Sequence, residues 1–354
     1  MEELNGYFAV HSQGLGHATR AVALARGLLE KRQGLSILFL AGSPALDLIV
    51  ANGFDALTMP PAPDWLAKDG VLQPMWRWYA DYARYYRVAR RFIRKEGDWD
   101  YYRLLISDSE LATAAEAVRR GVPTALILNS LHHDFATDLR SRIAEAYANF
   151  WSSRLARKVD LVLTVDEAPL WPNVRRIGPI VRPFSAPREK LREDFYFRKK
   201  TILVTAGGTA IGEFLVKAAI RAFLDLRLGD VSMVVVSGPK LTVDPAPGVY
   251  TYGFVPNLQD MVLAADLVIT TAGKGTVNEA LAAGTPVIAI PPKGQVEAER
   301  NAAALGFRFE DLRRLKEFIP EHLASGRLPP KTMGNEEATR LLLEFLEQEV
   351  RYPS

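Results

Sequence analysis

The chain has 354 residues, 48% of them hydrophobic and 24% charged, which is the composition of a soluble globular protein long enough for two domains. The formal net charge of +3 is too small to indicate nucleic-acid binding, and the absence of cysteine excludes disulfides, thiolate metal sites and a cysteine nucleophile. The N-terminal residues lack the apolar core of a signal peptide, and no apolar run approaches the ~18 residues of a membrane span. We therefore expect a cytoplasmic protein.

Short apolar runs rich in β-branched residues alternate with segments of helical spacing over the first half of the chain. Strands are predicted at residues 6–10, 35–41, 54–59, 103–108, 123–129 and 160–165. Between the first two, residues 18–30 place Ala18, Val22, Ala25 and Leu29 on one helix face. Strands that alternate with helices predict an α/β domain with a parallel sheet and right-handed crossovers.

A glycine-containing loop, HSQGLGHATR at residues 11–20, follows the first predicted strand. A dinucleotide-binding fingerprint is disfavoured because Thr19 occupies its third glycine position and no acid closes the next strand. Ligands bind outside the carboxyl ends of parallel strands, where His17 would begin a helix. A helix N-terminus disfavours the imidazolium form, so His17 is a candidate general base. The alternative is a structural histidine that caps the helix or hydrogen-bonds within the fold.

Residues 75–103 predict a helix that is both aromatic and basic. Trp78, Tyr82, Tyr85, Ala89 and Phe92 form one stripe, and Arg84, Arg87, Arg91 and Arg94 form another. Through residues 75–95 such a helix can rest on an anionic membrane surface, at the inner face of the membrane. In the alternative, the aromatic rings pack on the domain and the arginines face water or pair with acids. No recognition motif accompanies the charge, so no nucleic-acid partner is expected.

A change in composition marks the expected domain boundary. Residues 178–194, GPIVRPFSAPREKLRED, carry three prolines and many charges and lack periodicity. We predict an N-terminal domain at 1–182, a linker at 183–197, a second α/β domain at 198–333 and a C-terminal helix at 334–354. The second domain should have strands near 201–204, 231–238, 248–254, 265–271 and 285–292.

Two glycine turns of the second domain follow predicted strands and precede predicted helices. They are TAGGT at 205–209 and AGKGT at 272–276, in which Lys274 adds a positive charge. Backbone N–H groups at such turns can bind an anion, although glycines also serve tight packing alone. Glu279 lies about one turn into the second helix, where a carboxylate can accept two hydrogen bonds from a ribose diol. Alternatively, Glu279 is a solvated residue near a helix N-terminus.

The stretch 251–302, centred on AGKGTVNEALAAGTPVIAIP, resembles the donor-binding half of glycosyltransferases with the GT-B fold, and GLGHATR agrees with it. The similar group is family 28-like and contains the peptidoglycan N-acetylglucosaminyltransferase and the diacylglycerol glycosyltransferases. The resemblance implies two Rossmann-like domains whose parallel sheets face each other across a cleft. It also implies a nucleotide-sugar donor, usually UDP-linked, in the second domain and a hydroxyl acceptor, such as a lipid, in the first.

The donor-binding residues of the family carry over to matching positions of this chain. Glu279 matches the ribose ligand, and Phe254 and Val255 match the segment beside the base. The two diphosphate turns correspond to Gly207, Gly208, Thr209, Gly273, Lys274, Gly275 and Thr276. Gln295 lies near the position that contacts the donor sugar, but the peptidoglycan enzyme has adjacent glutamines where this chain has GQVEAERNA. The resemblance therefore does not fix the sugar.

The resemblance also implies the chemistry, with inversion at the sugar. His17 would remove the acceptor proton, and the glycine turns with Lys274 would stabilise the leaving diphosphate, with no metal and no other cofactor. His11, Gly14 and Gly16 would lie on the acceptor side. No cluster of residues has metal-ligand spacing. GLGHATRAVALA also resembles a UDP-sugar hydrolase of pseudaminic acid synthesis, which activates water at this histidine. A hydrolase and a non-catalytic sugar-nucleotide-binding protein are therefore the alternatives.

Overall fold

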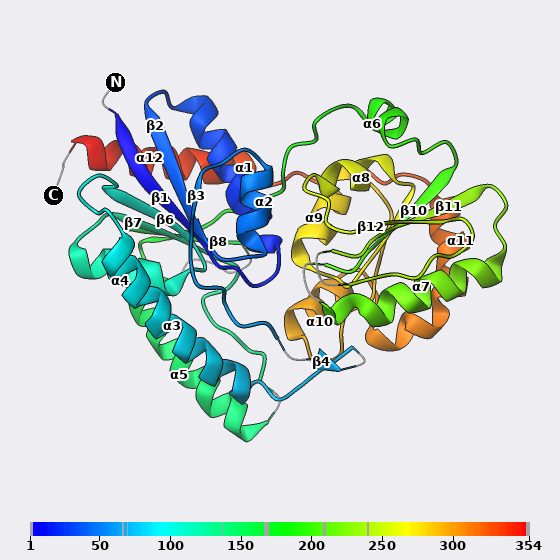
Figure 1. The fold of residues 1–354 in the computed structure, drawn as a ribbon, viewed down its shortest axis with the longest axis horizontal. Coiled ribbons are helices and arrows are strands. Elements are labelled where there is room, and N and C mark those ends of the chain that lie inside the picture. Colours follow the sequence, from blue (N-terminus) through cyan, green and yellow to red (C-terminus); the bar gives the residue numbers. More distant parts are fainter. Residues whose placement is uncertain are drawn as a thin grey trace. The chain divides into compact units, whose positions relative to one another are not determined.

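The computed structural model contains two α/β units, each built on a parallel sheet (Figure 1). It describes residues 3–65, 67–68, 70–136, 138–165, 170–207, 210–238 and 241–351. The first unit comprises Met1–Asp64, Pro74–Ile180 and Met333–Ser354, and the second comprises Trp65–Gln73 and Val181–Thr332. The predicted α/β class is confirmed.

The first unit has a seven-stranded parallel sheet of order β3-β2-β1-β6-β7-β8-β9. Its strands are β1 (Leu4–Val10), β2 (Leu35–Ala41), β3 (Ala56–Thr58), β6 (Leu104–Asp108), β7 (Thr124–Leu128), β8 (Leu161–Thr164) and β9 (Val174–Arg176). The first six correspond to the six predicted strands, with small differences at their ends, whereas β9 was not predicted. The chain reverses its direction of winding between β1 and β6, and such a switch point is where open α/β sheets bind ligands.

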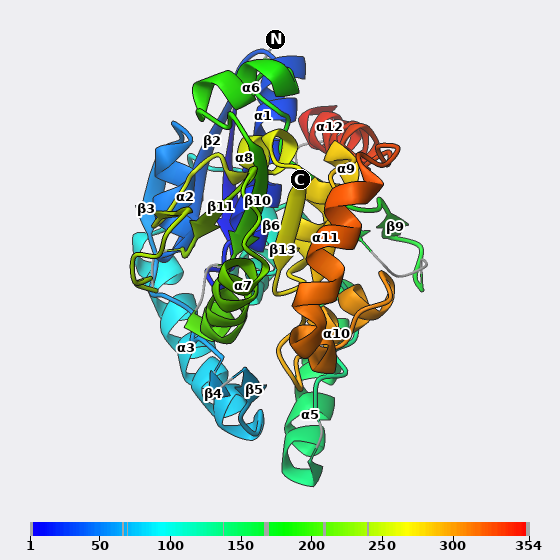
Figure 2. The same cartoon turned by 90° about the vertical axis from the view of Figure 1, so that its right-hand side faces the viewer.

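Helices cover both faces of this sheet (Figure 2). One face carries α3 (Trp76–Glu96), α4 (Leu111–Arg120) and α5 (Leu139–Ala156), and the other carries α1 (Gly16–Lys31), α2 (Ala45–Ala51) and α12 (Asn335–Arg351). The C-terminal α12 packs against α1, where Gly27 leaves room for Thr339. Among the described helices, none combines the length and the apolar character needed to cross a bilayer.

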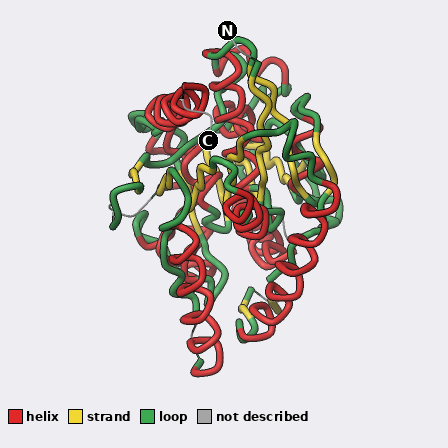
Figure 3. Tube along the Cα trace, turned by 90° about the vertical axis from the view of Figure 1, so that its left-hand side faces the viewer, coloured by secondary structure: helices red, strands yellow, loops and turns green. Residues whose placement is uncertain are grey.

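The second unit has a five-stranded parallel sheet of order β12-β11-β10-β13-β14. Its strands are β10 (Lys200–Thr205), β11 (Val231–Val236), β12 (Val249–Tyr252), β13 (Leu267–Thr270) and β14 (Val287–Ala289). One face packs against α7 (Glu213–Leu226), α10 (Val296–Ala303) and α11 (Leu315–Ser325), with the 3-10 turns η1 (Ala210–Gly212) and η2 (Phe309–Arg314) beside them. The other face packs against α6 (Arg188–Asp194), α8 (Leu258–Ala264) and α9 (Lys274–Ala283). Figure 3 shows helices in red and strands in yellow along the described chain.

Two segments lie in a different unit from the one that the sequence pattern indicates. The short strands β4 (Ala67–Lys68) and β5 (Val71–Leu72) belong to the second unit, because Leu72 N–H donates to the Lys293 carbonyl at 2.9 Å and Lys293 N–H donates to the Gly70 carbonyl at 2.7 Å. The expected linker 183–197 contains α6, which buries Leu191 in the second core. The first segment attaches through backbone hydrogen bonds. The second attaches through Leu191, Phe197 and neighbouring apolar side chains, whose spacing is not periodic.

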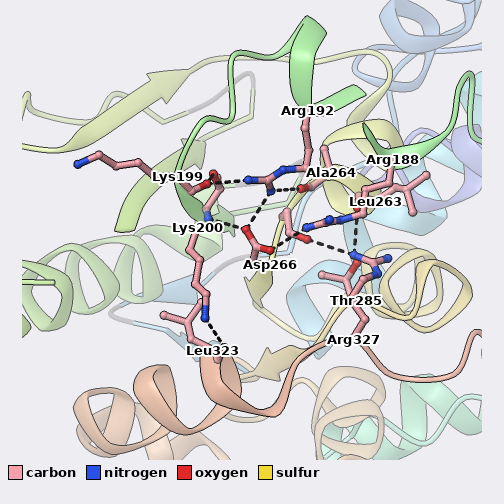
Figure 4. A network of polar contacts seen from close by, with 12 residues as sticks. Arg188, Arg192, Lys199, Lys200, Leu263, Ala264, Asp266, Thr285, Leu323 and Arg327 are labelled. Carbon is pink, nitrogen blue, oxygen red and sulfur yellow. Dashed lines mark hydrogen bonds and ion pairs between the residues drawn. The ribbon is translucent and has the colours of Figure 1, made fainter. Parts of the chain in front are cut away.

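A network around Asp266 closes the amino end of the second sheet (Figure 4). Arg188 donates to Asp266 Oδ1 at 2.7 Å, and Arg192 donates to Oδ2 at 2.9 Å. Arg327 donates to main-chain carbonyl oxygens at the ends of α8 and α9. The pKa of Arg327 is lowered by burial and by the neighbouring Arg188. The network is structural, and it lies at the opposite end of the strands from the glycine turns.

Candidate active site

His17 lies at the carboxyl edge of the first sheet, beside the switch point. It is the second residue of α1, which follows β1 after a short loop. The end of β1 pairs with the end of β6, in the register Val10 to Asp108. The first turn of α1 and the last residue of β6 therefore meet at the edge where parallel sheets bind ligands.

The imidazole of His17 is hydrogen-bonded to the carboxylate of Asp108. His17 Nδ1 lies 2.8 Å from Asp108 Oδ1, and Arg20 donates to Asp108 through Nε at 2.6 Å and through Nη2 at 2.5 Å. Burial raises the pKa of Asp108, but the Arg20 guanidinium and the hydrogen bond from His17 outweigh it and hold this pKa at about 2. Asp108 is thus an ionised acceptor.

This carboxylate decides which nitrogen of His17 carries the proton. An ionised carboxylate only accepts, so Nδ1 must donate to it, and Nε2 is left as the acceptor. Arg20 Nη2 lies 3.4 Å from the same Nδ1, but two donors do not bond to each other, and the 2.8 Å contact to Asp108 is the shorter one. The side chain of His17 is 20% exposed. His17 can therefore present an unprotonated Nε2 to a ligand, as a general base must.

Arg20 links His17 and Asp108 to the end of another strand, β7. Its Nη1 donates to Asn129 Oδ1 at 2.5 Å, and Asn129 directly follows β7. Arg20 and Asn129 were not predicted as site residues, since they are separated by 109 positions and contact each other only once strand order is known. The available signal was that Asp108 and Asn129 both end predicted strands. The network fixes α1 against β6 and β7 and so orients His17.

His11, predicted on the acceptor side, lies in the interior of the first unit. Its side chain is 7% exposed, and its ring packs against those of Tyr82 and Tyr85. Its Nδ1 lies 3.5 Å from Glu110 Oε2, which also accepts a hydrogen bond from the Tyr85 hydroxyl. The His11 ring lies 5.7 Å from that of His17. His11 therefore packs beneath the loop that carries His17, and a contact with an acceptor would require its exposure.

The two glycines of the loop have open space beside them. Gly14 has φ +70°, a left-handed conformation that favours glycine. A Cβ added at Gly14 or at Gly16 would meet no atom within 4 Å. The backbone next to His17 is therefore not packed against another part of the described chain, as the predicted approach of an acceptor requires.

The aromatic stripe of α3 packs on the domain, contrary to the expected membrane contact through residues 75–95. Tyr85, Ala89 and Ile93 are buried in the first core, and Tyr82 and Phe92 pack against it. At the end of the helix, Arg90 and Arg94 pair with Glu116 of α4. Arg84, Arg87 and Arg91 remain exposed. The domain therefore covers the rings of Tyr82, Tyr85 and Phe92, and contact of this helix with a membrane surface stays a prediction.

The two glycine turns of the second unit lie side by side. Thr205 at the end of β10 pairs with Thr270 at the end of β13, and a Cβ added at Gly207 would lie 3.7 Å from Thr271 Oγ1. Gly207 has φ +78°, and Ala272 has φ +60°. Gly208 and Thr209 lie outside the described residues. Both turns occupy the switch point of the second sheet, between β10 and β13.

The helix α9 begins at this point with its first N–H groups directed out of the helix. Gly273 is its N-cap and supplies no side-chain cap, and Lys274, Gly275 and Thr276 form the first turn. All three are partly buried. The first N–H groups of a helix have no acceptor within the helix, so a helix N-terminus beside a lysine is suited to phosphate.

Glu279 is buried one turn further along α9. Its carboxylate accepts a hydrogen bond from Arg182 Nη2 at 3.2 Å, and Arg182 Nη1 also donates to the carbonyl of Pro256. Burial raises the pKa of Glu279, and Arg182 opposes that effect. Because Pro256 follows Phe254 and Val255, one guanidinium joins the predicted ribose ligand to the predicted base-binding segment. The solvated alternative for Glu279 is wrong. Arg182 was not predicted, since it lies in the proline-rich boundary segment.

Gln295 is the N-cap residue of α10. Glu299 of this helix accepts a hydrogen bond at 2.8 Å from the N–H of Gly294, which lies in the loop before Gln295. Asn301 of the same helix donates to the Ala272 carbonyl at 3.0 Å, which ties α10 to the turn before α9. The structure thus connects the segment GQVEAERNA to the predicted diphosphate turn.

Proteins with similar sequences are glycosyltransferases. Residues 201–327 match the glycosyltransferase family 28 C-terminal domain. The UDP-N-acetylglucosamine--N-acetylmuramyl-(pentapeptide) pyrophosphoryl-undecaprenol N-acetylglucosamine transferase of Mycolicibacterium vanbaalenii is 28% identical over 86% of this chain and 78% of that protein. An uncharacterized glycosyltransferase of Methanosarcina acetivorans is 24% identical over 83% of this chain and 79% of that protein.

Solved structures of glycosyltransferases share the fold. The glycotransferase of kitacinnamycin aligns with a TM-score of 0.63 at 14% identity, over 98% of this chain and all of that chain (100%). The spinosyn rhamnosyltransferase SpnG aligns with a TM-score of 0.60 at 16% identity, over 98% of this chain and 99% of that chain. The chain therefore has the GT-B fold. The family match and the relatives identify it as a glycosyltransferase that is similar to family 28, as the sequence resemblance indicated.

The low pKa of Asp108 predicts a loss of stability in acid. A carboxyl group whose pKa is lowered by folding stabilises the protein above its unfolded pKa, and this contribution disappears as the pH falls through the folded pKa. For Asp108 the window runs from pH about 4 down to about 2, and the contribution is about 2 kcal/mol. We expect the stability advantage of the wild type over Asp108→Asn, measured by urea unfolding, to shrink by this amount across the window. A constant difference, or an equal change for the exposed Asp81→Asn, would contradict the assignment.

Proposed function

We propose that this enzyme transfers a sugar from a UDP-linked donor to a hydroxyl group of a lipid-linked acceptor, with inversion and without a metal. The observation that carries the proposal is the hydrogen bond from His17 Nδ1 to the buried, ionised carboxylate of Asp108. It leaves Nε2 free to accept a proton at the carboxyl edge of a parallel sheet. A base in that position suits the removal of a proton from an attacking hydroxyl group.

The proposed reaction is a single displacement at the anomeric carbon. The acceptor oxygen forms the new bond to this carbon as its proton passes to His17 Nε2, and the bond from the carbon to the diphosphate breaks. Attack from the face opposite the leaving group gives inversion. The negative charge that develops on the diphosphate is stabilised by the first N–H groups of α9 and by Lys274. Asp108 stabilises the imidazolium that forms on His17.

The donor assignment rests on the second unit. We propose that the turns at Gly207 and Gly273 bind the diphosphate and that Glu279 binds the ribose hydroxyls. Phe254 and Val255 would lie beside the base, and Gln295 would contact the sugar. Support comes from the switch-point position of both turns and from Arg182, which joins Glu279 to the base-binding segment. The relative from Mycolicibacterium vanbaalenii has a UDP-sugar in its name.

The acceptor assignment rests on the relatives and on the loop around His17. The name of the Mycolicibacterium vanbaalenii relative specifies an undecaprenol-linked acceptor. We propose an acceptor of the same chemical kind, a hydroxyl group on a lipid-linked molecule, which would be met at the inner face of the membrane. Gly14 and Gly16 leave open backbone for it beside His17.

Release of the nucleoside diphosphate tests this proposal. The enzyme is incubated with UDP-, GDP- and dTDP-sugars, each with and without a lipid extract. We expect release from a UDP-sugar only, and only when lipid is present. Release at the same rate without lipid would identify a hydrolase that activates water at His17. Release from a GDP- or dTDP-sugar in preference to the UDP-sugars would overturn the donor assignment.

A further inference from the structure

The hairpin of β4 and β5 comes from the first half of the chain but is built into the second unit (Figure 2). It lies within Trp65–Gln73, whereas the rest of that unit begins only at Val181. A two-stranded hairpin is marginally stable by itself in water. The hairpin must therefore owe its place to its contacts with the second unit, and these contacts indicate what it does there.

The first contact joins β5 to the loop that follows β14. Val71 forms a parallel bridge with Lys293. On either side of this bridge, Leu72 N–H donates to the Lys293 carbonyl at 2.9 Å, and Lys293 N–H donates to the Gly70 carbonyl at 2.7 Å. Gly294 follows with φ +85°, and a Cβ added to it would lie 3.5 Å from Leu72 Cβ. The hairpin thus binds both backbone polar groups of Lys293.

The second contact joins the hairpin to the first turn of α7. Gly70 is buried with φ +76°, and a Cβ added to it would lie 2.8 Å from the ring of Phe214. The Phe214 ring packs in turn against that of Phe309, at 5.7 Å between centroids. Because α7 follows β10 and the Lys293 loop follows β14, both contacts lie at the carboxyl edge of the second sheet. The two glycine turns lie at the same edge.

The loop that the hairpin holds ends at Gln295, the residue assigned to the donor sugar. Gln295 N–H donates to the Pro292 carbonyl at 3.3 Å, and Gly294 N–H donates to Glu299 of α10 at 2.8 Å. The loop is therefore fixed from two sides, by α10 and by the hairpin. A hydrogen bond to a sugar hydroxyl weakens steeply as its distance and angle change. The position of this loop therefore decides how well Gln295 can bind the sugar.

We propose that the hairpin positions the loop Lys293–Gln295 for the donor sugar, so that Trp65–Gln73 contributes to recognition of the sugar and not of the nucleotide. The inference rests on the proposed function, which takes Gln295 to contact the sugar. The hairpin acts through this loop, so its residues are positioning residues. The nucleotide is assigned to Glu279 and to the segment at Phe254, which belong to other parts of the unit, and its binding should not depend on the hairpin.

A comparison of UDP with UDP-sugars tests the inference on the full chain. Leu72→Pro removes the N–H that donates to Lys293, and Gly70→Ala places a methyl group against Phe214 at a positive φ. Titration calorimetry measures the Kd for UDP, UDP-N-acetylglucosamine and UDP-glucose. In both variants we expect the Kd for the preferred UDP-sugar to rise about tenfold, which corresponds to the loss of one or two hydrogen bonds, and the Kd for UDP to change by less than about twofold.

Each variant has a matched control. Leu72→Ala keeps both the backbone N–H and the Cβ that lies beside Gly294. Gly326→Ala introduces a similar backbone strain at φ +69°, where an added Cβ would meet no described atom within 4 Å. Both controls should bind UDP and the UDP-sugars like the wild type. Melting temperatures of the four variants show whether the fold is intact.

The outcomes separate this inference from the proposed function. Affinities for UDP and for the UDP-sugars that are unchanged in Leu72→Pro and Gly70→Ala, or that fall by the same factor, would overturn the positioning role and leave the donor assignment standing. A wild type that binds neither UDP nor the two UDP-sugars would overturn the donor assignment itself, and the inference with it.

Discussion

Replacing His17 with Gln is expected to lower kcat by about 10²–10⁴ while leaving the affinity for the donor unchanged. Glutamine can still donate to Asp108, so the carboxylate and Arg20 keep a partner, but the side chain has no basic nitrogen. The acceptor hydroxyl would then have to lose its proton to water. The loss should appear in kcat, since the donor-binding residues lie in the second unit.

Two measurements complete this experiment. Donor affinity is measured by calorimetry on the same preparation, and melting temperatures show whether the fold is intact. His322→Gln is the matched control, because His322 is also partly buried and, among the described residues, its ring contacts Phe307 and Phe318 of the second unit. If His17→Gln retained turnover within a few-fold of the wild type, the base would have to be another group.

Replacing Glu279 with Gln is the second substitution with a large expected effect. The dissociation constant for the donor should rise by about ten- to a hundredfold, because hydrogen bonds to a charged group contribute roughly 1.5–3 kcal/mol. Glutamine keeps the size of the side chain, so Arg182 retains an acceptor. Titration calorimetry with the nucleotide-sugar measures the change. Glu321→Gln, at an exposed position of α11, should bind the donor like the wild type.

The raised pKa of Glu279 adds a pH dependence to the same experiment. As the pH falls, this carboxyl group is protonated at a higher pH than an ordinary glutamate, and its ability to accept two hydrogen bonds falls with it. Donor affinity of the wild type should therefore weaken on mild acidification, and that of Glu279→Gln should not. An affinity that is the same in both proteins at neutral pH would exclude Glu279 as the ribose ligand.

The fold could be predicted from the sequence because short stretches of the chain are enough to indicate its strands and glycine turns. Each strand of the two large sheets, apart from β9, is an apolar run between turn residues, and each glycine turn follows such a run. The glycine turns could be placed at strand ends for the same reason. The hairpin of β4 and β5 could not be predicted, since a few backbone hydrogen bonds to Lys293 hold it on the second unit and such bonds are independent of side-chain type.

The side chains that contact the candidate site residues could not be predicted from a sequence pattern. His17 was predicted from its own position, but its hydrogen bond to Asp108 spans 91 residues and depends on β1 and β6 being neighbours. Arg182 lies in a segment without periodicity, so nothing local indicated that its side chain would be buried against Glu279.

The fate of the sugar distinguishes transfer to a lipid acceptor from hydrolysis of the donor. A UDP-sugar labelled in the sugar is incubated with lipid extract and either the wild type or His17→Gln, and lipid-bound and free label are separated by extraction into organic solvent. We expect label on the lipid with the wild type, very little with the variant, and little free sugar with either. Free labelled sugar, formed by the wild type at the same rate with and without lipid, would contradict transfer and assign hydrolysis to the site.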